Sequence, residues 1–342
     1  MRFSKMLATL GAVAALATTT LSSAAWADGV PIKFTLDWKI QGVHAWFYHA
    51  LEAGYFADEG LDVTIDQGEG SAATVTRIMS GAYDAGFGDM NAIIQNAALT
   101  PGEAPVMVYQ IYNQPPFALL TKTGGPVGDL TDLEGLTIGA PPGSASTRLF
   151  PALADAAGFD ADAVEILSIA PNLQEQVLIQ DQVAGSLVFN VTSYLNIIGL
   201  GMDPMEDFTW FPYGDAGLDI YSNGVMVSPA LYNDNPEAVA GLVKAINRAV
   251  QDVLADPEAG VAVVAGVEPL IEQDLELLRL QFALDNLIVS DESTAAGIGA
   301  VDMERLTRSI GIISELYELP SSPDAASVYD AQFLPAAEER VL

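Results

Sequence analysis

The chain has 342 residues, half of them apolar, and its 45 acidic and 13 basic side chains give a formal net charge of −32. A field this negative repels nucleic acid and anionic lipid, so neither is expected as a partner. The sequence has no cysteine, which excludes disulfides, thiolate metal sites and cysteine nucleophiles. A chain of this length exceeds the size at which one core stops growing, so two lobes are expected.

The first 27 residues have the three parts of a secretory signal peptide. Arg2 and Lys5 precede an apolar run from Met6 to Ala17, and Ala25-Trp26-Ala27 has the small-residue pattern of a cleavage site. The apolar run is shorter than the ~20 residues that a membrane-spanning helix needs. We therefore predict cleavage after Ala27 and a periplasmic mature protein that is not embedded in the membrane. An uncleaved membrane anchor is the alternative interpretation.

Strands and helices alternate in the first part of the mature chain. The strands are predicted at 32–36, 61–65, 85–88 and 106–111, and the helices at 45–57, 72–80 and 91–99. The segment Leu61-Asp62-Val63-Thr64-Ile65 alternates apolar and polar residues, as a strand with one buried face does. Strands separated by helices of this length predict right-handed crossovers and a largely parallel sheet.

A second α/β run follows the first. Phe117 to Thr121 is interpreted as a strand leaving the first sheet, and further strands are predicted at 136–139, 164–169 and 185–189. Helical segments are predicted at 144–158 and near 173–180. Tyr221 to Val227 resembles a return strand, and Asn235-Pro236-Glu237 has the cap and proline that start a long helix to Leu254. The rest is mostly helical, over 271–287 and 301–316.

This order of elements predicts an α/β protein with two lobes. Residues 28–120 and 222–342 are assigned to lobe 1, and residues 121–221 to lobe 2. Two crossing segments, near 117–123 and 219–227, would form a hinge. Ligands of open parallel sheets bind beyond the carboxyl ends of the strands, so an interlobe cleft would collect those loops from both sides.

The loop after the first predicted strand is rich in aromatic side chains. Two Trp, a Phe and a Tyr fall between Asp37 and Tyr48, in a chain that is only 8% aromatic. Trp38 lies on the strand-to-helix loop, where its ring can face the cleft. Adjacent residues of a helix diverge, so Trp46 and Phe47 cannot both be buried on one face. We predict ligand contacts for Asp37, Trp38 and Trp46, and interpret Phe47 and Tyr48 as core residues.

Other loops at strand ends carry polar side chains. Ser71 follows the alternating strand, and Asp89 and Asn91 follow the third strand. The loop from Gly139 to Arg148 joins a strand to a helix, with hydroxyls at the exposed first turn. Unpaired amides at a helix start, joined by hydroxyls, can bind a carboxylate, a sulfonate or a polar heteroatom, and simple N-capping is the alternative. The candidate residues of this loop are Gly143, Ser144, Ser146 and Arg148.

These side chains suit a small, planar or partly aromatic ligand. Further aromatic residues near predicted loops and strand ends can stack against it, at ~0.5–2 kcal/mol for each contact; they are Tyr112, Trp210, Tyr213 and Tyr221. Asn190 can read a polar end of the ligand. An aminopyrimidine suits this lining best. An aromatic carboxylate or sulfonate needs cationic donors, of which only Lys39, Arg77 and Arg148 lie near the loops, and a quaternary amine is a further alternative.

The sequence has no pattern typical of a metal centre or a hydrolase. His44 and His49 are the only histidines, and they form neither of the histidine pairs that bind zinc. The G-x-S-x-G motif is absent as well. We therefore predict no catalytic residue, no metal and no cofactor.

Several segments together resemble a known family. Leu36-Asp37-Trp38, His44-Ala45, Ala50 to Phe56 and Glu59 to Val63 are similar to the opening signature of the periplasmic binding proteins for thiamine precursors, sulfonates and nitrate. This is the NMT1/THI5-like and SsuA-like group. Asp132 to Gly139, with Pro142-Gly143-Ser144, resembles the entry to that family's second lobe.

The resemblance implies a type II periplasmic-binding-protein fold, with an interlobe cleft that closes on a small-molecule solute and a monomer that docks to the permease of an ABC importer. The family also includes enzymes that build a thiamine pyrimidine from a histidine and pyridoxal phosphate with a cysteine-rich iron motif. His44 stands where that histidine would, but this chain has no cysteine. In a binding protein we expect His44 to hydrogen-bond the solute instead, and capping or packing of the helix is the alternative. A sensor that reports ligand occupancy to a membrane receptor is the third interpretation.

Overall fold

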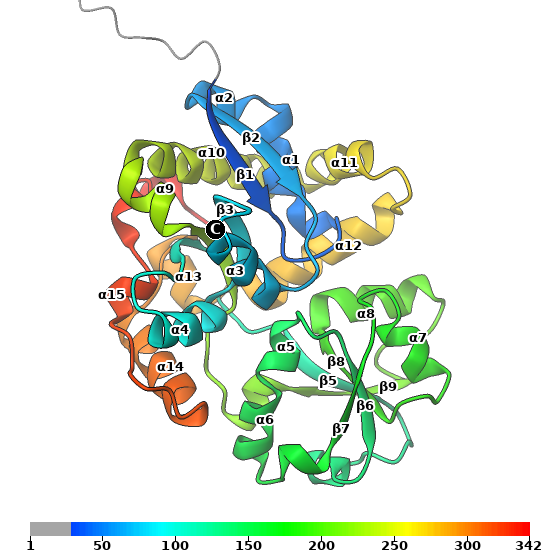
Figure 1. Ribbon diagram of the computed structural model, residues 1–342. Helices are drawn as coiled ribbons and strands as arrows, with labels where there is room; N and C mark the ends of the chain where they lie inside the picture. Colours follow the sequence, from blue (N-terminus) through cyan, green and yellow to red (C-terminus); the bar gives the residue numbers. More distant parts are fainter. Residues whose placement is uncertain (1–28) are drawn as a thin grey trace, which may run out of the picture.

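The computed structural model describes residues 29–342, so the predicted signal peptide and its cleavage after Ala27 lie outside the described residues. The chain builds two five-stranded sheets, one above the other in Figure 1. The first has the order β2-β1-β3-β10-β4 and the second the order β7-β6-β8-β5-β9. The part that carries the first sheet, residues 29–110 and 223–342, is called the first half below, and residues 117–212 the second half.

The strands of the two sheets follow the same plan. Their bounds are β1 Val30–Thr35, β2 Leu61–Asp66, β3 Ala85–Asp89, β4 Val106–Gln110 and β10 Asn223–Val227, then β5 Phe117–Lys122, β6 Thr137–Ala140, β7 Glu165–Ser168, β8 Gly185–Phe189 and β9 Phe208–Pro212. In each sheet one strand, β10 or β5, runs antiparallel to both neighbours, and the other four are parallel. The predicted α/β class and largely parallel sheets are confirmed.

Helices follow most of the strands, as the alternation predicts. In the first half they are α1 Ala45–Glu52, α2 Tyr55–Asp58, α3 Ser71–Met79, α4 Met90–Leu99, α9 Pro229–Asp234, α10 Pro236–Ala255, α11 Pro257–Val267, α12 Gln273–Ala283, α13 Asp291–Ala296, α14 Met303–Leu316 and α15 Ala325–Val328. In the second half they are α5 Ala145–Arg148, α6 Phe150–Ala157, α7 Gln174–Ile179 and α8 Asn190–Gly199. None of the helices in residues 29–342 is both long and apolar enough to cross a bilayer.

Three local features differ from the sequence prediction. The helix predicted at 45–57 is two helices, α1 and α2, because Gly54 adopts a left-handed conformation with φ 76° that turns the chain. Helix α8 and strand β9 were not predicted. Strand β9 lies at the edge of its sheet and four of its five residues are only half-buried, so no fully buried face imposes an apolar alternation on its sequence.

The chain passes between the halves twice, at residues 111–116 and 213–222. The predicted crossings near 117–123 and 219–227 overlap strands instead, because β5 pairs along its length with β8 and β9, and β10 with β3 and β4. The assignment of lobes with boundaries at 120 and 222 stays a prediction. The strand pairing favours boundaries within the two crossing segments.

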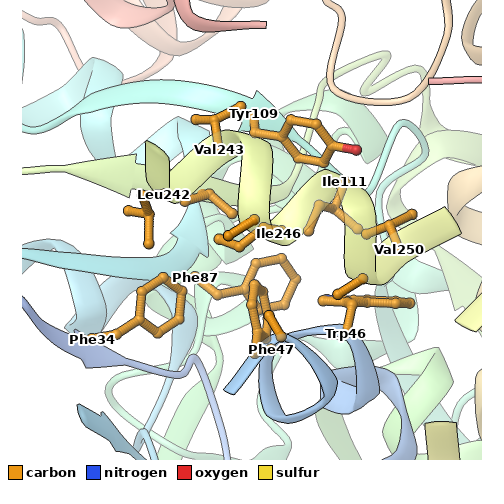
Figure 2. Packing of buried hydrophobic residues seen from close by; sticks show 14 of the residues in the cluster. Phe34, Trp46, Phe47, Phe87, Tyr109, Ile111, Leu242, Val243, Ile246 and Val250 are labelled. Atoms are coloured by element: carbon orange, nitrogen blue, oxygen red, sulfur yellow. The ribbon is translucent and has the colours of Figure 1, made fainter. Parts of the chain in front are cut away.

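The core of the first half lies between its sheet and the helices α1 and α10. Asn235 caps α10 by accepting a hydrogen bond from the Ala238 amide at 3.2 Å. Figure 2 shows Leu242 and Ile246 of α10 above the rings of Phe34, Phe47 and Phe87. Burying one Leu or Ile side chain of this kind stabilises the fold by ~1.5–3 kcal/mol.

Trp46 belongs to this core, which corrects its prediction as a ligand contact. Its side chain is 1% exposed and packs edge-on against Phe47, with ring centroids 6.1 Å apart. The two adjacent rings are both buried because α1 packs against both α10 and α11, while the Phe47 ring also contacts Phe34 and Phe87 of the sheet. The assumption that this helix buries only one face is therefore wrong.

Candidate ligand-binding site

A cavity with about 390 Å³ of empty space, part of it open to solvent, lies between the two halves. Its walls are loops and first helical turns that follow strands of both sheets, as expected for ligand sites in α/β sheets. The first half and its crossing segment contribute Asp37, Trp38, Gln41, Val43, Ser71 and Tyr112, and the second half contributes Ser144, Gln174, Phe189, Val191 and Thr192.

Five of the predicted site residues line the cavity: Asp37, Trp38, Ser71, Tyr112 and Ser144. Six lining residues were missed: Gln41, Val43, Gln174, Phe189, Val191 and Thr192. The missed residues of the second half lie at the end of β8 or in the first turns of α7 and α8. Ser71 and Ser144 were predicted because they are polar residues at helix starts that follow strands. The same criterion applies to the missed residues of α8, but α8 was not recognised in the sequence.

Asp37 is the centre of the polar wall. It follows β1, is 6% exposed, and its carbonyl oxygen accepts the Gly70 amide at 2.7 Å. Its Oδ1 accepts a hydrogen bond from His44 Nε2 at 2.8 Å, and its Oδ2 accepts one from Asn223 Nδ2 at 2.8 Å. A carboxylate oxygen can accept two hydrogen bonds, so each oxygen keeps one acceptor site. Asp37 is thus held in place and can still accept N–H or O–H donors.

His44 orients Asp37 and does not line the cavity. The Gln41 amide donates to His44 Nδ1 at 3.1 Å, so the ring proton lies on Nε2, the atom that faces Asp37. Both ring nitrogens are engaged and the side chain is fully buried. The predicted direct contact of His44 with a ligand is therefore corrected to a positioning role.

No lysine or arginine lines the cavity. Lys39 is exposed on the outer surface, and Arg77 donates to Thr35 Oγ1 at 3.1 Å and to the Gln67 carbonyl at 3.0 Å. Arg279 is buried nearby, but its guanidinium makes four hydrogen bonds to protein groups. The only ionisable carboxyl of the lining, Asp37, is therefore not balanced by a lining cation.

Hydroxyl groups from the two halves form a second polar region. Ser71 starts α3 and its hydroxyl is buried without a hydrogen-bond partner. Ser144 precedes α5 and its hydroxyl lies 2.8 Å from that of Ser146. The halves touch directly here, since the Ala73 amide donates to the Gly143 carbonyl at 3.2 Å. Of the predicted loop residues, Gly143 and Ser146 support this wall without lining the cavity.

Asp89 and Asn91 lie outside the cavity, contrary to the prediction. Asp89 caps α4, where it accepts the Ala92 amide at 3.2 Å and Asn91 Nδ2 at 2.9 Å, and Asn91 also donates to the Tyr221 carbonyl at 2.7 Å. Burial raises the pKa of Asp89 to about 7, although these hydrogen bonds lower it. Their place at a strand end was predicted correctly, but capping directs the side chains into the protein.

Four further predicted residues are also away from the cavity. Tyr213 is fully buried and donates to the Ser146 carbonyl at 2.8 Å. The hydroxyl of Tyr221 bonds to Glu292, and the Arg305 guanidinium lies 4.1 Å from its ring centroid. The remaining two are Asn190, whose carboxamide oxygen accepts the adjacent Val191 amide at 2.6 Å, and the exposed Arg148.

Within residues 29–342, His, Asp and Glu side chains form no group of three or more that could hold a metal ion. The polar groups that line the cavity are instead side chains that accept or donate hydrogen bonds. They are the Asp37 carboxylate, the side-chain amides of Gln41 and Gln174, and the hydroxyls of Ser71, Ser144, Thr192 and Tyr112.

The fold is that of the periplasmic binding proteins. The alkanesulfonate-binding protein SsuA from Xanthomonas axonopodis pv. citri superposes with a TM-score of 0.65 at 13% identity, over 89% of this chain and 99% of that protein. Residues 41–260 match the model of the NMT1/THI5 like family. The chain belongs to this family, as the resemblance predicted.

Three named proteins are similar in sequence. The riboflavin-binding protein RibY of Chloroflexus aurantiacus is 25% identical over 84% of this chain and 82% of its own length. The formylaminopyrimidine-binding protein of Halalkalibacterium halodurans is 24% identical over 75% of this chain and 77% of its own. The 4-amino-5-hydroxymethyl-2-methylpyrimidine phosphate synthase of Aspergillus parasiticus is 25% identical over 70% of this chain and 71% of its own.

Proposed function

We propose that this chain is the periplasmic solute-binding subunit of an ABC importer, and that its solute is a neutral or cationic heteroaromatic molecule of the aminopyrimidine kind. Membership of the NMT1/THI5 like family supports the binding role. Two of the relatives are named for binding riboflavin and formylaminopyrimidine, which are both nitrogen heteroaromatics.

The observation that carries the proposal is the Asp37 carboxylate in a cavity without a lining cation. An N–H donor of the solute would satisfy its free acceptor sites. An anionic group placed about 4 Å from it would instead be repelled by ~4 kcal/mol at the effective dielectric constant usual for protein sites. That is about a thousandfold in affinity. A carboxylate or sulfonate solute, the sequence-based alternative, is therefore disfavoured.

The aromatic residues of the lining favour a flat solute. Trp38, Tyr112 and Phe189 lie on both sides of the cavity, and each ring contact contributes ~0.5–1.5 kcal/mol beyond the buried area. The hydroxyls of Ser71 and Ser144 can donate to a ring nitrogen or a carbonyl oxygen. A solute with N–H donors at one edge and acceptors at another fits both polar regions.

The test is a thermal-shift and calorimetric comparison of three solutes. Formylaminopyrimidine and riboflavin are compared with an alkanesulfonate, for the parent chain and for Asp37→Asn. A solute at 100 times its Kd stabilises the folded chain by ~2.7 kcal/mol. We expect this shift with at least one heteroaromatic solute, and its loss in Asp37→Asn. Tight binding of the sulfonate alone would overturn the proposal.

The enzyme interpretation makes a different prediction. Both nitrogens of His44 are engaged by Gln41 and Asp37, which favours a structural role for this histidine. We expect formylaminopyrimidine to be recovered unchanged after incubation with the purified chain. Chemical conversion of it would favour the enzyme instead, and co-purification with a receptor rather than a permease would favour a sensor.

A further inference from the structure

Helix α12 of the first half packs against α8 of the second half beside the cavity. We propose that Glu276 and Arg279 of α12 form a clasp between the two cavity walls and are positioning residues that set how long a solute stays bound. The role in solute retention rests on the proposed function, whereas the clasp itself rests on contacts between the halves.

Arg279 holds the wall of the second half. Its guanidinium is 2% exposed, and Nη1 donates to the carbonyl oxygens of Val191 at 2.8 Å and Thr192 at 2.7 Å. Nη2 donates to Asn196 Oδ1 at 3.0 Å. Val191 and Thr192 line the cavity, so the arginine fixes the backbone from which two lining side chains project.

Glu276 holds the wall of the first half. Its Oε2 accepts Arg279 Nε at 2.9 Å and the Gly42 amide at 2.6 Å. Gly42 lies between Gln41 and Val43, which both line the cavity. A Cβ atom at Gly42 would be only 2.3 Å from the Glu276 carbonyl oxygen, so the loop and the helix fit closely. One ion pair thus connects the backbone of both walls.

The clasp can form only when the halves are closed. Arg279 lies on α12 and donates to three acceptors on α8, which follows β8 of the other sheet. The ring of Tyr194 on α8 also packs on that of Phe282 on α12, with centroids 4.9 Å apart. A buried guanidinium is tolerated only when it is paired and hydrogen-bonded. Separation of the halves would remove three hydrogen bonds and admit water, so the clasp favours closure.

The test compares the parent chain with the double variant Glu276→Gln/Arg279→Met, which removes both charges and so leaves neither of them buried and unpaired. Stopped-flow fluorescence with formylaminopyrimidine measures kon and koff. We expect koff to rise at least about tenfold with little change in kon, because hydrogen bonds to charged groups typically contribute more than one decade each. A general loss of stability would not raise koff while leaving kon nearly unchanged.

Arg248→Met is the matched control. Arg248 pairs with Asp58 at 3.0 Å, but both residues are exposed and lie in the first half. Its removal is expected to leave koff unchanged. If the double variant does not fold, Arg279→Lys, which keeps the charge without the planar fork, should raise koff by a smaller factor. An unchanged koff in that variant would count against the clasp.

A second readout does not depend on the solute. The chain lacks cysteine, so Gln176→Cys on α7 and Ala259→Cys on α11 provide two exposed sites for spin labels, one in each half. Pulsed electron paramagnetic resonance without solute should give longer interlabel distances in the double variant than in the parent.

The two readouts separate the possible failures. Longer distances together with no binding of formylaminopyrimidine by the parent would support the clasp and refute the proposed solute. Unchanged distances and an unchanged koff would refute the clasp.

Discussion

Asp37 depends on its neighbours for its position in the cavity wall. His44 and Asn223 donate to its two oxygens at 2.8 Å each, and the Gln41 amide fixes the tautomer of His44. The contacts from His44 and Asn223 leave one acceptor site free on each oxygen of the carboxylate. Asp37 lines a cavity whose lining supplies no cation, and under the proposed function this combination favours solutes that donate hydrogen bonds.

Trp38 provides the clearest single-residue prediction. Its side chain is half-buried and lines the cavity, so Trp38→Ala removes a stacking surface without opening a core. We expect the Kd for formylaminopyrimidine to rise about tenfold, in line with ~1.5 kcal/mol for one aromatic contact, and the melting temperature of the free chain to stay nearly constant. Isothermal titration calorimetry measures the first and differential scanning calorimetry the second.

Trp210→Phe is the matched control for this prediction. Trp210 is also half-buried, but it lies on β9 and its Nε1 donates to the Pro204 carbonyl at 2.8 Å, away from the cavity. Its affinity for formylaminopyrimidine should equal that of the parent. Equal affinities of Trp38→Ala and the parent would remove Trp38 from the site.

Most site residues predicted from the sequence lie near the carboxyl ends of strands, where the cavity is. The direction of each side chain decides which of them reach the cavity. Ser71 comes after β2, and Asp89 is the last residue of β3. Ser71 lines the cavity, whereas Asp89 turns inward to cap α4. Sequence position gives the end of the sheet where the loops gather, but not the hydrogen bonds that orient each side chain.

At the scale of elements, the two halves meet where the loop before α3 touches the loop before α5. Gly70 has φ 140°, which side chains rarely adopt, and a Cβ there would be 2.0 Å from the Gly143 carbonyl oxygen. Gly143 is less constrained, since a Cβ on it would be 2.8 Å from the Glu69 carbonyl oxygen. The contact therefore needs glycine more strictly in the first half than in the second.

Gly70→Ala should hinder closure of the halves. We expect it to weaken binding of formylaminopyrimidine more than tenfold, because strained backbone of this kind costs ~1–3 kcal/mol and the new methyl group prevents the close approach. Gly143→Ala should weaken binding less. Calorimetric titration of both variants shows which of them loses more affinity. A larger loss in Gly143→Ala would contradict the account of this contact.

The cap of α4 predicts a pH dependence of stability. The pKa of Asp89 is raised by burial from 3.8 to about 7. Between these values the folded chain keeps a proton that the unfolded chain has lost, so stability is fully present below pH ~4 and is lost as the pH rises through 7. Between pH 5 and 8 the loss from this group is about 3 kcal/mol.

Asp89→Asn removes this titration and keeps a cap acceptor. In urea unfolding, its free energy of unfolding should fall less between pH 5 and 8 than that of the parent. Asp129→Asn is the control, because Asp129 also caps a helix but is exposed, and hydrogen bonds to Thr131 lower its pKa. An identical pH profile for Asp89→Asn and the parent would refute the assignment.

At the scale of the whole molecule, the alternation of strands and helices predicted the α/β class, and it is confirmed. The two sheets share one strand order although no sequence repeat was detected, because topology constrains hydrophobic periodicity and not residue identity. The contacts between the halves could not be predicted. Arg279 and Val191 are 88 positions apart in the chain, and no local pattern indicates that they meet.

The acidic surface is consistent with the proposed solute class. With a net charge of −32, the molecule repels anions at long range and attracts cations, which affects the rate of encounter more than the final affinity. The cavity and the surface therefore favour the same kinds of solute, neutral or cationic.

A crystal structure of the chain with formylaminopyrimidine tests the central claim most directly. We predict that the ring lies between the two halves beside Trp38, with an N–H group within hydrogen-bonding distance of the Asp37 carboxylate. A solute bound elsewhere, or an acceptor or anionic group placed against Asp37, would contradict the account.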